Sequence, residues 1–432
     1  MRIAFVSQGL GRIDPPRAYG SISIWTYGVL KELAKSEHII AYEMEGGLLR
    51  SRTKYERGVT YIYAPTLLNR LINRYHRALH RVKSMTGYIT GSRGTPIFAS
   101  SIHNVGYVLW VALNLRKQQC DVIHIHQFSQ YVPIVRFFNP KSKIVLHMNC
   151  EWLSQLDPAM IAGRLEAVDA IVGCSTHILR RILEKFPHLD KKCSVVFNGA
   201  DVGLFVPSVG AVAMNSPDTL RILFVGRISP EKGVHILVEA FKLVAAEYPT
   251  ARLELVGGTG SMPEEFLVSL SDDPAVKGLK RFYGRDYLED LRNRIPEGLA
   301  DRVRFHGSVA HGELAGHYSR ATVFAISSLS DAFPLTAIEA MAAGLPVAGS
   351  AVGGIAEAVV DESTGLLVEP DNPEALAAAL SRLLGDSNLR RRMGSAGRER
   401  ALRLFSWRAI ADQVSRVYDT VVETESTHKG VC

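Results

Sequence analysis

The stretch RILFVGRISPEKGVHILVEAFKLVAAEY, residues 221–248, decides the fold. It begins with a short apolar run (221–226), turns at a glycine-bounded loop (226–233), and continues with apolar residues at helical spacing (234–248). A continuous run rich in Val, Ile and Leu is typical of a strand buried on both faces of a parallel sheet. The stretch therefore predicts a strand, a loop and a covering helix, the repeating unit of a doubly wound sheet.

The same rhythm recurs along the whole chain. Further strands are expected at 2–7, 121–126, 143–148, 170–175 and 193–199, and then at 252–257, 302–307, 322–327, 346–350 and 365–370, with another helix at 373–385. A small, polar, Pro- and Gly-punctuated stretch separates the two series, which is typical of a linker. The sequence predicts an α/β protein of two Rossmann-like, doubly wound parallel-sheet domains facing a central cleft. Their expected bounds are 1–206 and 220–407, with a linker at 207–219 and a C-terminal helix at 408–425 that packs back on the first domain.

Composition indicates a globular cytoplasmic protein. Of 432 residues, 47% are hydrophobic and 22% are charged, enough apolar material for two cores. Five cysteines without a C-x-x-C pair argue against a disulfide framework or a zinc knuckle. The N-terminus is expected to be a buried strand rather than a signal peptide, and no apolar run is long enough to span a bilayer. Residues 1–200 carry 26 basic and 13 acidic side chains, so the first half favours an anionic partner.

The loop at 226–233 is a candidate diphosphate site. Gly226 permits a sharp turn after the strand, and Arg227 and Lys232 then bracket a loop that opens a helix. A diphosphate needs positive charge from more than one direction, and a helix N-terminus adds partial positive charge. The alternative is two basic residues on an exposed turn. No G-K-[ST] follows, so the loop is not a Walker A motif.

The segment SSLSDAFPLTAIEAMAAGLPV, residues 327–347, is the second candidate. Asp331 and Glu339 lie on either side of an expected helix start at Phe333–Pro334. A helix start leaves the amides of its first turn, here those of Leu335 and Thr336, free to meet an anion. Two carboxylates at this separation can accept hydrogen bonds from the hydroxyls of a sugar and of a ribose. The alternative is a capping Asp and a Glu on the helix surface.

Taken together, the two segments resemble the signature of the retaining glycosyltransferases of glycosyltransferase family 4, which have the GT-B fold. The resemblance spans most of the chain. It also includes NGADVGLF (198–205), RVRFHGSV (302–309) and AVGGIAEAV (351–359).

The resemblance implies roles at matching positions. Arg227 and Lys232 would hold the donor diphosphate, Glu339 the nucleotide ribose, and Asp331 the transferred sugar. His126, at the end of a first-half strand, would lie near that sugar. Further donor contacts are expected from these residues: Gly226, Val309 (by its backbone, to the base), Phe333, Pro334, Leu335 and Thr336.

Two departures from the family pattern affect the sugar and the acceptor. Asp331 stands where Glu is usual and Ala332 where Gly is usual, which shortens the sugar contact by one methylene. Near the N-terminus, Ser21 follows Gly20 in place of a second glycine, and its Cβ limits close approach to the backbone. The expected acceptor side consists of Gly20, Ser21, His147 and Glu151.

The sequence therefore predicts a retaining glycosyltransferase that passes a hexose from a nucleotide diphosphate sugar, with UDP favoured over GDP, to a hydroxyl acceptor. The resemblance implies that a donor phosphate oxygen takes the acceptor proton. No cofactor and no metal are expected, since no Asp-x-Asp pair is present. The acceptor classes left open are lipid-linked, polysaccharide and small natural product. A nucleotide-sugar epimerase, a phosphorylase and a non-catalytic sugar-nucleotide-binding protein remain alternatives.

A basic helix is expected within residues 50–93, which carry ten Lys/Arg and one acid. One face carries Leu68, Leu71, Ile72, Tyr75, Leu79 and Val82, and the opposite stripe carries Arg70, Arg74, Arg77 and Arg81. One interpretation is a surface for anionic lipid at the inner membrane face or for a phosphorylated acceptor. The other is the solvated face of a helix packed on the first sheet. Nucleic-acid binding is disfavoured because stacking aromatics and recognition motifs are missing.

Overall fold

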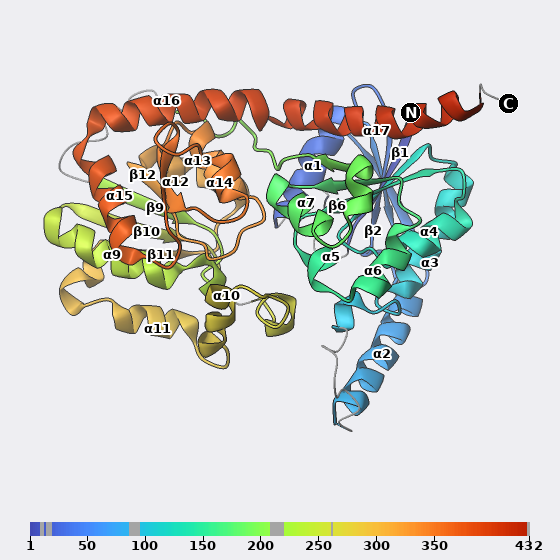
Figure 1. The fold of residues 1–432 in the computed structure, drawn as a ribbon, viewed down its shortest axis with the longest axis horizontal. Helices are drawn as coiled ribbons and strands as arrows, with labels where there is room; N and C mark the ends of the chain where they lie inside the picture. The colour runs from blue at the N-terminus through green and yellow to red at the C-terminus, as the bar shows by residue number, and fades with distance from the viewer. Residues whose placement is uncertain (9–12, 14–19, 86–95, 208–219, 261, 430–432) are drawn as a thin grey trace. The chain divides into compact units, whose positions relative to one another are not determined.

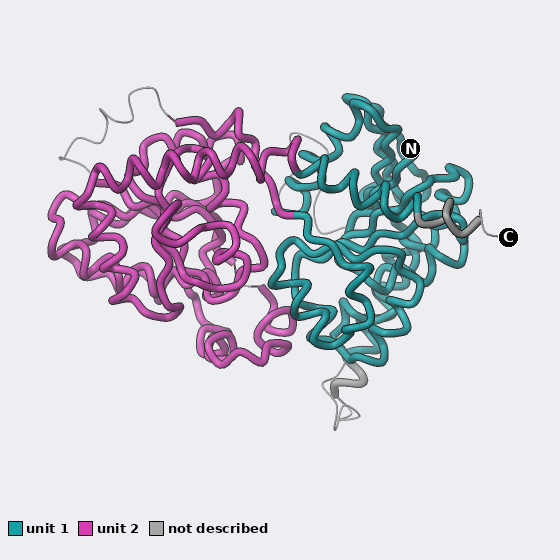
Figure 2. The backbone as a smooth tube through the Cα atoms, turned by 45° about the horizontal axis from the view of Figure 1, so that its top comes forward, with its two compact units in different colours: residues 1–196, 410–432 teal, residues 197–409 magenta. Residues whose placement is uncertain are grey.

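The structure is a computed structural model that describes residues 1–8, 13, 20–85, 96–207, 220–260 and 262–429, without the side chains of 81–85 and 424–429. The chain forms two compact units (Figure 2). Unit 1 comprises residues 1–196 and 410–432, and unit 2 comprises residues 197–409. The boundary thus falls before the predicted one at 206, and the predicted linker lies outside the described residues apart from Pro207.

Unit 1 is built on an eight-stranded sheet (Figure 1). In spatial order its strands are β3 (Arg52–Glu56), β4 (Val59–Tyr63), β2 (His38–Glu43), β1 (Arg2–Val6), β5 (Val122–His126), β6 (Lys143–Met148), β7 (Ala170–Gly173) and β8 (Cys193–Val195). All neighbours are parallel except β3, which pairs antiparallel with β4 at the edge. The chain order reverses between β1 and β5, which makes that pair the topological switch point.

Helices join the strands of unit 1. They are α1 (Ser21–Leu33), α2 (Leu67–Met85), α3 (Val105–Gln118), α4 (Tyr131–Phe138), α5 (Trp152–Gln155), α6 (Pro158–Leu165) and α7 (Thr176–Leu183). The final helix, α17 (Trp407–Lys429), begins in unit 2, and its residues from Ile410 onward belong to unit 1. Its buried Tyr418 packs against His124 of β5.

Unit 2 is built on a six-stranded, wholly parallel sheet (Figure 1). In spatial order its strands are β11 (Val303–Gly307), β10 (Ala251–Val256), β9 (Leu220–Val225), β12 (Val323–Ile326), β13 (Val347–Ser350) and β14 (Gly365–Val368). This is the strand order of a dinucleotide-binding fold, with its switch point between β9 and β12. The prediction of doubly wound parallel sheets is confirmed for both units.

Helices join the strands of unit 2 and follow the last of them. They are α9 (Val234–Glu247), α10 (Pro274–Gly278), α11 (Tyr287–Arg294), α12 (Leu314–Arg320), α13 (Leu335–Ala342), α14 (Ile355–Ala358), α15 (Pro373–Gly385) and α16 (Ser387–Leu404). Because strand side chains alternate between faces, Ile222 and Phe224 of β9 join one core with α9 and α15, whereas Leu223 points to the face that carries α12.

Helix α2 packs in an unexpected orientation. Its asparagine and histidine face is buried: Asn69 is 4% exposed and His76 is 6% exposed. The Nδ2 atoms of Asn69 and Asn73 donate to Oδ1 of Asn104, at 3.2 and 2.7 Å, beside the start of α3. The expectation that the apolar face could pack on the sheet is wrong for its described outer residues, Leu68, Leu71 and Tyr75, which are 53%, 58% and 68% exposed.

Candidate active site

The candidate active site of unit 2 lies at its topological switch point. The loop 226–233 follows β9, and the loop that begins at Ser327 follows β12. Because β9 and β12 are parallel neighbours, their carboxyl ends bring these loops together at one edge of the sheet. Ligands of open α/β sheets bind at this position.

Direct hydrogen bonds hold the two loops together. Ser327 Oγ donates to the carbonyl oxygens of Lys232 and Gly233, at 3.1 and 2.9 Å. The backbone N–H of Leu329 donates to the carbonyl oxygen of Glu231 at 2.9 Å. Gly233 has φ 63°, and a Cβ there would lie 1.9 Å from the carbonyl oxygen of Ser327. Glycine at 233 is therefore a condition for this close approach.

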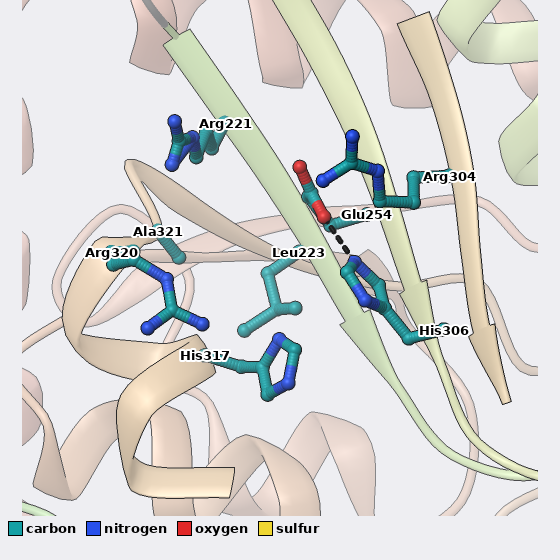
Figure 3. A pocket seen from close by; sticks show the side chains of 8 residues that line it. All are labelled: Arg221, Leu223, Glu254, Arg304, His306, His317, Arg320 and Ala321. Carbon is teal, nitrogen blue, oxygen red and sulfur yellow. Dashed lines mark hydrogen bonds and ion pairs between the residues drawn. The ribbon is translucent and has the colours of Figure 1, made fainter. Parts of the chain in front are cut away.

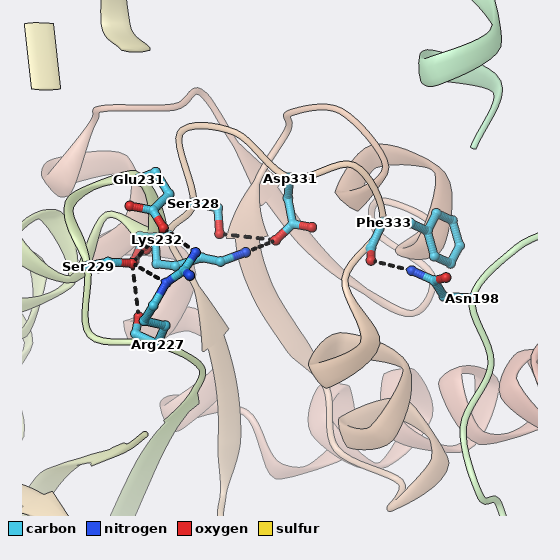
Figure 4. Close-up of polar contacts among 9 residues, drawn as sticks. Asn198, Arg227, Ser229, Glu231, Lys232, Ser328, Asp331 and Phe333 are labelled. Carbon is cyan, nitrogen blue, oxygen red and sulfur yellow. Dashed lines mark hydrogen bonds and ion pairs between the residues drawn. The ribbon is translucent and has the colours of Figure 1, made fainter. Parts of the chain in front are cut away.

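Lys232 and Asp331 form an ion pair at the centre of the site (Figure 4). Lys232 Nζ lies 2.7 Å from Asp331 Oδ2, and Ser328 Oγ donates to the same oxygen at 3.4 Å. The Asp331 side chain is 9% exposed and that of Lys232 is 26% exposed. Two residues singled out separately, one for phosphate and one for sugar, are thus in contact, and Asp331 holds the ammonium group in place.

Arg227 has a partner that the sequence analysis missed. Its Nη2 donates to Glu231 Oε1 at 2.6 Å and its Nε to Ser229 Oγ at 3.3 Å (Figure 4). Ser229 Oγ in turn donates to Glu231 Oε1 at 2.7 Å. Glu231 is 3% exposed, whereas the Arg227 side chain is 40% exposed and accessible to a ligand. The i,i+4 spacing of Arg227 and Glu231 was the available signal.

The loop before α13 is fixed by its backbone and its aromatic side chain. Asn198 Nδ2 donates to the carbonyl oxygen of Phe333 at 2.9 Å (Figure 4), and Phe197 stacks on the Phe333 ring with centroids 5.0 Å apart. Gly353 has φ 47°, and a Cβ there would lie 2.1 Å from the carbonyl oxygen of Asp331. Phe333 is 4% exposed, so its ring supports the loop from the protein interior.

Helix α13 begins one residue later than expected. Pro334 is its N-cap and Leu335 its first residue, followed by Thr336. Leu335 is 8% exposed and Thr336 is half-buried. The first-turn amides have no acceptor within the helix, and they lie at the loop that carries Asp331.

Glu339 is buried on α13 at 2% exposure, so the alternative of a helix-surface glutamate is wrong. Its Oε1 lies 2.7 Å from His311 Nε2, and its Oε2 accepts from the Tyr318 hydroxyl at 2.9 Å. Burial acts to lower the pKa of His311, but the hydrogen bond and charge of Glu339 outweigh it and raise that pKa. Neither partner was expected, because both lie in a segment that showed no motif.

The remaining donor-side residues follow strand ends of the same sheet. Gly226 directly follows β9, and its N–H donates to the carbonyl oxygen of Val256 at 2.9 Å. Val309 comes two residues after β11 and is half-buried. Gly226 and Val309 thus both lie in loops at the edge of the sheet where the carboxyl ends of its strands meet.

In unit 1, His126 lies at the carboxyl end of β5 and belongs to a buried group of histidines. His126 and His147 are paired across β5 and β6, and each is at most 1% exposed. His124 Nε2 shares a hydrogen bond with His147 Nδ1 at 3.2 Å, and its Nδ1 with the Tyr418 hydroxyl at 2.8 Å. His126 Nε2 lies 3.1 Å from Thr26 Oγ1. Alternate positions in a strand share one face, so the spacing of His124 and His126 could have predicted that these two side chains lie together.

These three imidazoles are the donor type that a transition metal accepts. Their ring nitrogens lie within 4.8 Å of one another, and burial lowers the pKa of all three, that of His126 to about 3. Neutral imidazoles are metal-competent. Four of their six ring nitrogens are engaged with Tyr418, Thr26 and each other, which ties α17 to the unit 1 core, whereas His126 Nδ1 and His147 Nε2 are buried without a partner among the described residues.

The other acceptor-side candidates lie at helix starts of unit 1. Gly20, with φ 86°, is the N-cap of α1, and Ser21 is its exposed first residue. Glu151 is the N-cap of α5 and lies 2.9 Å from His177 Nε2. Burial opposes ionisation of Glu151, but the contacts with His177 and Arg181 prevail and lower its pKa.

Comparisons with known proteins identify relatives of this chain by sequence. The model of the family described as "Glycosyl transferases group 1" matches residues 214–400. The D-inositol 3-phosphate glycosyltransferase of Kineococcus radiotolerans is 33% identical over 319 residues, 69% of this chain and 68% of its own.

Two solved structures share the fold over nearly the whole chain. A sucrose-phosphate synthase from Thermosynechococcus elongatus has TM-score 0.67 and 24% identity, and covers 98% of this chain and 99% of its own. Anabaena HepE, solved with UDP and glucose, has TM-score 0.66 and 18% identity, and covers 97% and 100%.

Proposed function

The chain belongs to the group 1 glycosyl transferases and has the GT-B fold; from this premise we propose that it is a retaining hexosyltransferase that uses a UDP-sugar donor. The observation that carries the proposal is the Lys232–Asp331 ion pair at the switch point of unit 2, beside Arg227. It pairs a cation suited to the diphosphate with a carboxylate suited to the sugar.

The donor diphosphate would be held from two sides. Arg227 and Lys232 come from one loop, and the first-turn amides of α13 come from the other. Negative charge grows on the diphosphate as the sugar–oxygen bond breaks. Cations and amides that are already fixed stabilise this charge without reorganising, which lowers the barrier. A donor phosphate oxygen would take the acceptor proton, and no metal is part of the proposal.

Glu339 would accept hydrogen bonds from the ribose hydroxyls. His311 and Tyr318 each use one lone-pair site of the carboxylate, and an ionised carboxylate has about four. Both partners orient the side chain, so the ribose would meet a fixed acceptor. UDP is the favoured nucleotide because the fold relative HepE was solved with UDP.

The acceptor would be chosen by unit 1, through Gly20, Ser21, His126, His147 and Glu151. A relative named for D-inositol 3-phosphate makes a phosphorylated polyol the first acceptor to test. Lipid-linked, polysaccharide and small-molecule hydroxyls complete the panel.

Product analysis tests the proposal. The enzyme is incubated with UDP-glucose and the acceptor panel, with and without EDTA, and products are assigned by mass spectrometry and by NMR of the anomeric proton. We expect a glycoside of unchanged anomeric configuration and no effect of EDTA. Lys232→Ala and Arg227→Ala should each lower kcat/KM, by an amount that corresponds to the loss of about 2–4 kcal/mol of transition-state stabilisation. An epimerised donor, an inverted product, or UDP binding without turnover would contradict it.

We further propose that α2 meets an anionic membrane surface. Its exposed Leu68, Leu71 and Tyr75 neighbour the exposed stripe of Arg70, Arg74 and Arg77 on the outward side of the helix; Arg81 continues the stripe in sequence. The apolar side chains would insert at the level of the lipid headgroups, and the guanidinium groups would contact anionic lipid. Both contributions would favour membrane binding. Among the described residues, no helix has the length and apolarity of a bilayer span.

Vesicle flotation tests this surface. Full-length protein should float with phosphatidylglycerol-containing vesicles and stay behind with neutral ones. The double variant Leu71→Ser/Tyr75→Ser should lose most binding. Phe137→Ser, which removes an apolar side chain 78% exposed on α4, is the matched control and should float like the wild type. Equal flotation of both variants would count against the surface.

A further inference from the structure

A polar pocket in unit 2 has a lining that does not include Arg227, Lys232 or Asp331 (Figure 3). It is formed by the outward face of β9, β10 and β11 and by the end of α12, and its volume is about 110 Å³. Three arginines from three elements line it: Arg221 of β9, Arg304 of β11 and Arg320 of α12. Figure 3 shows them around Leu223, with His306 and His317 completing the ring.

The arginines outnumber the acidic side chains of the pocket. Within the part of the chain that the structure describes, none of the three guanidinium groups forms an ion pair or a side-chain hydrogen bond, and Nε of Arg221 is buried without a partner. The carboxylate that lines the pocket, Glu254, is instead paired with His306. The three arginines and one glutamate of the lining sum to a formal charge of +2, the histidines aside.

The excess of positive charge suits a bound anion. Like charges that share a partly desolvated space repel one another, and a buried guanidinium nitrogen without an acceptor loses its hydration. Burial lowers the pKa of His317, and His306 and Arg320 lower it further, whereas Glu254 and Glu313 act in the opposite direction. Arginine is also the side chain that best matches the oxygens of phosphate.

The pocket has room for such a ligand. A single water needs a cavity of roughly 10–15 Å³, so about 110 Å³ accommodates a group of several oxygen atoms. We propose that this pocket binds a phosphate group, as inorganic phosphate or as a phosphate monoester. The proposal is independent of the proposed transferase function.

The site is distinct from the donor site. Arg221 is near the amino end of β9, whereas Arg227 follows its carboxyl end. Six residues of strand at about 3.3 Å each separate them by roughly 20 Å. Phosphate bound here would therefore not compete for Arg227 or Lys232.

Isothermal titration with the full-length protein tests the proposal. Inorganic phosphate and methyl phosphate are titrated at constant ionic strength, with sodium chloride as the salt control. Wild-type protein should bind phosphate saturably, and Arg304→Gln and Arg320→Gln should each weaken binding at least tenfold. Both residues are exposed, so unchanged thermal unfolding can verify that the variants fold. A preference for methyl phosphate would identify a monoester as the ligand, and a preference for inorganic phosphate would identify the free anion. Equal affinity would show that the site recognises the phosphate group itself.

Two further variants make the result specific. Arg285→Gln removes an exposed arginine of the same unit outside the pocket and should bind like the wild type, whereas Arg227→Gln reports any phosphate bound at the donor site. The proposal is overturned if phosphate shows no saturable binding, if all variants bind equally, or if only Arg227→Gln loses binding. The last outcome would assign the phosphate to the donor site and would leave the proposed transferase intact.

Discussion

Gly233→Ala is the substitution whose effect follows most directly from the structure. Gly233 joins the short 3-10 turn Pro230–Lys232 to α9, with φ 63°, and an added Cβ would lie 1.9 Å from the carbonyl oxygen of Ser327. The left-handed backbone alone costs a non-glycine residue about 1–2 kcal/mol. The overlap adds to this, because a carbon and an oxygen in contact need well over 3 Å.

The chain can relieve the overlap only by separating the two loops by more than about 1 Å, and a displacement of 1 Å at a reacting centre can cost about 100-fold in rate. Ser327 bonds the carbonyl oxygens of Lys232 and Gly233, so the movement would carry Lys232 away from Asp331. We expect kcat/KM with a UDP-sugar to fall by roughly 100-fold, and the thermal midpoint of unit 2 to fall by about 2–8 °C for 1–2 kcal/mol.

Steady-state kinetics and calorimetry measure both effects. Gly298→Ala is the matched control, because a Cβ there meets no atom within 4 Å and its φ is not positive. If Gly233→Ala kept both the wild-type kcat/KM and the wild-type midpoint, the argument that glycine is required for the contact between these loops would be refuted.

Two predictions concern pH and have opposite signs. In unit 2, Glu339 raises the pKa of His311 above its unfolded value. The stability from this pair is therefore complete below the unfolded pKa and is lost as pH rises through the folded pKa. Calorimetry of Glu339→Gln should show a thermal midpoint that declines less steeply with rising pH above neutrality than that of the wild type. In unit 1, burial lowers the pKa of His124, His126 and His147, so unfolding takes up protons once pH drops below the unfolded value near 6.5. Stability should then fall by about 1.4 kcal/mol per pH unit for each proton taken up, and a pH-independent midpoint between pH 7 and 5 would contradict this.

The fold could be predicted wherever a strand is buried on both faces. The strand at 143–148 and the helix at 373–385 have the predicted bounds, because a continuous apolar run and a regular apolar spacing are local signals. The three strands between 38 and 63 were not predicted. β3, with the sequence RTKYE, lies at the sheet edge with mostly solvent-facing polar side chains, so its strand character depends on pairing with β4.

The candidate site could be predicted as separate residues but not as contacts. Lys232 and Asp331 were each identified from a loop after a strand, and the switch point then explains why they meet. His311 and Tyr318 escaped notice because their role depends on how α12 and the turn before it approach Glu339. The orientation of α2 could not be predicted either, because Asn69 and Asn73 face the protein interior by donating hydrogen bonds to Asn104, which lies on a distant segment.

The most direct test of the account compares the affinities of UDP and UMP by isothermal titration. If Arg227 and Lys232 grip the diphosphate, the wild-type protein should prefer UDP by at least tenfold, since a hydrogen bond to a charged group contributes about 1.5–3 kcal/mol. The double variant Arg227→Ala/Lys232→Ala should bind both nucleotides alike, while Lys242→Ala, which removes a lysine paired with Glu239 on α9, should keep the preference. A preference for UDP that survives in the double variant would contradict the central claim.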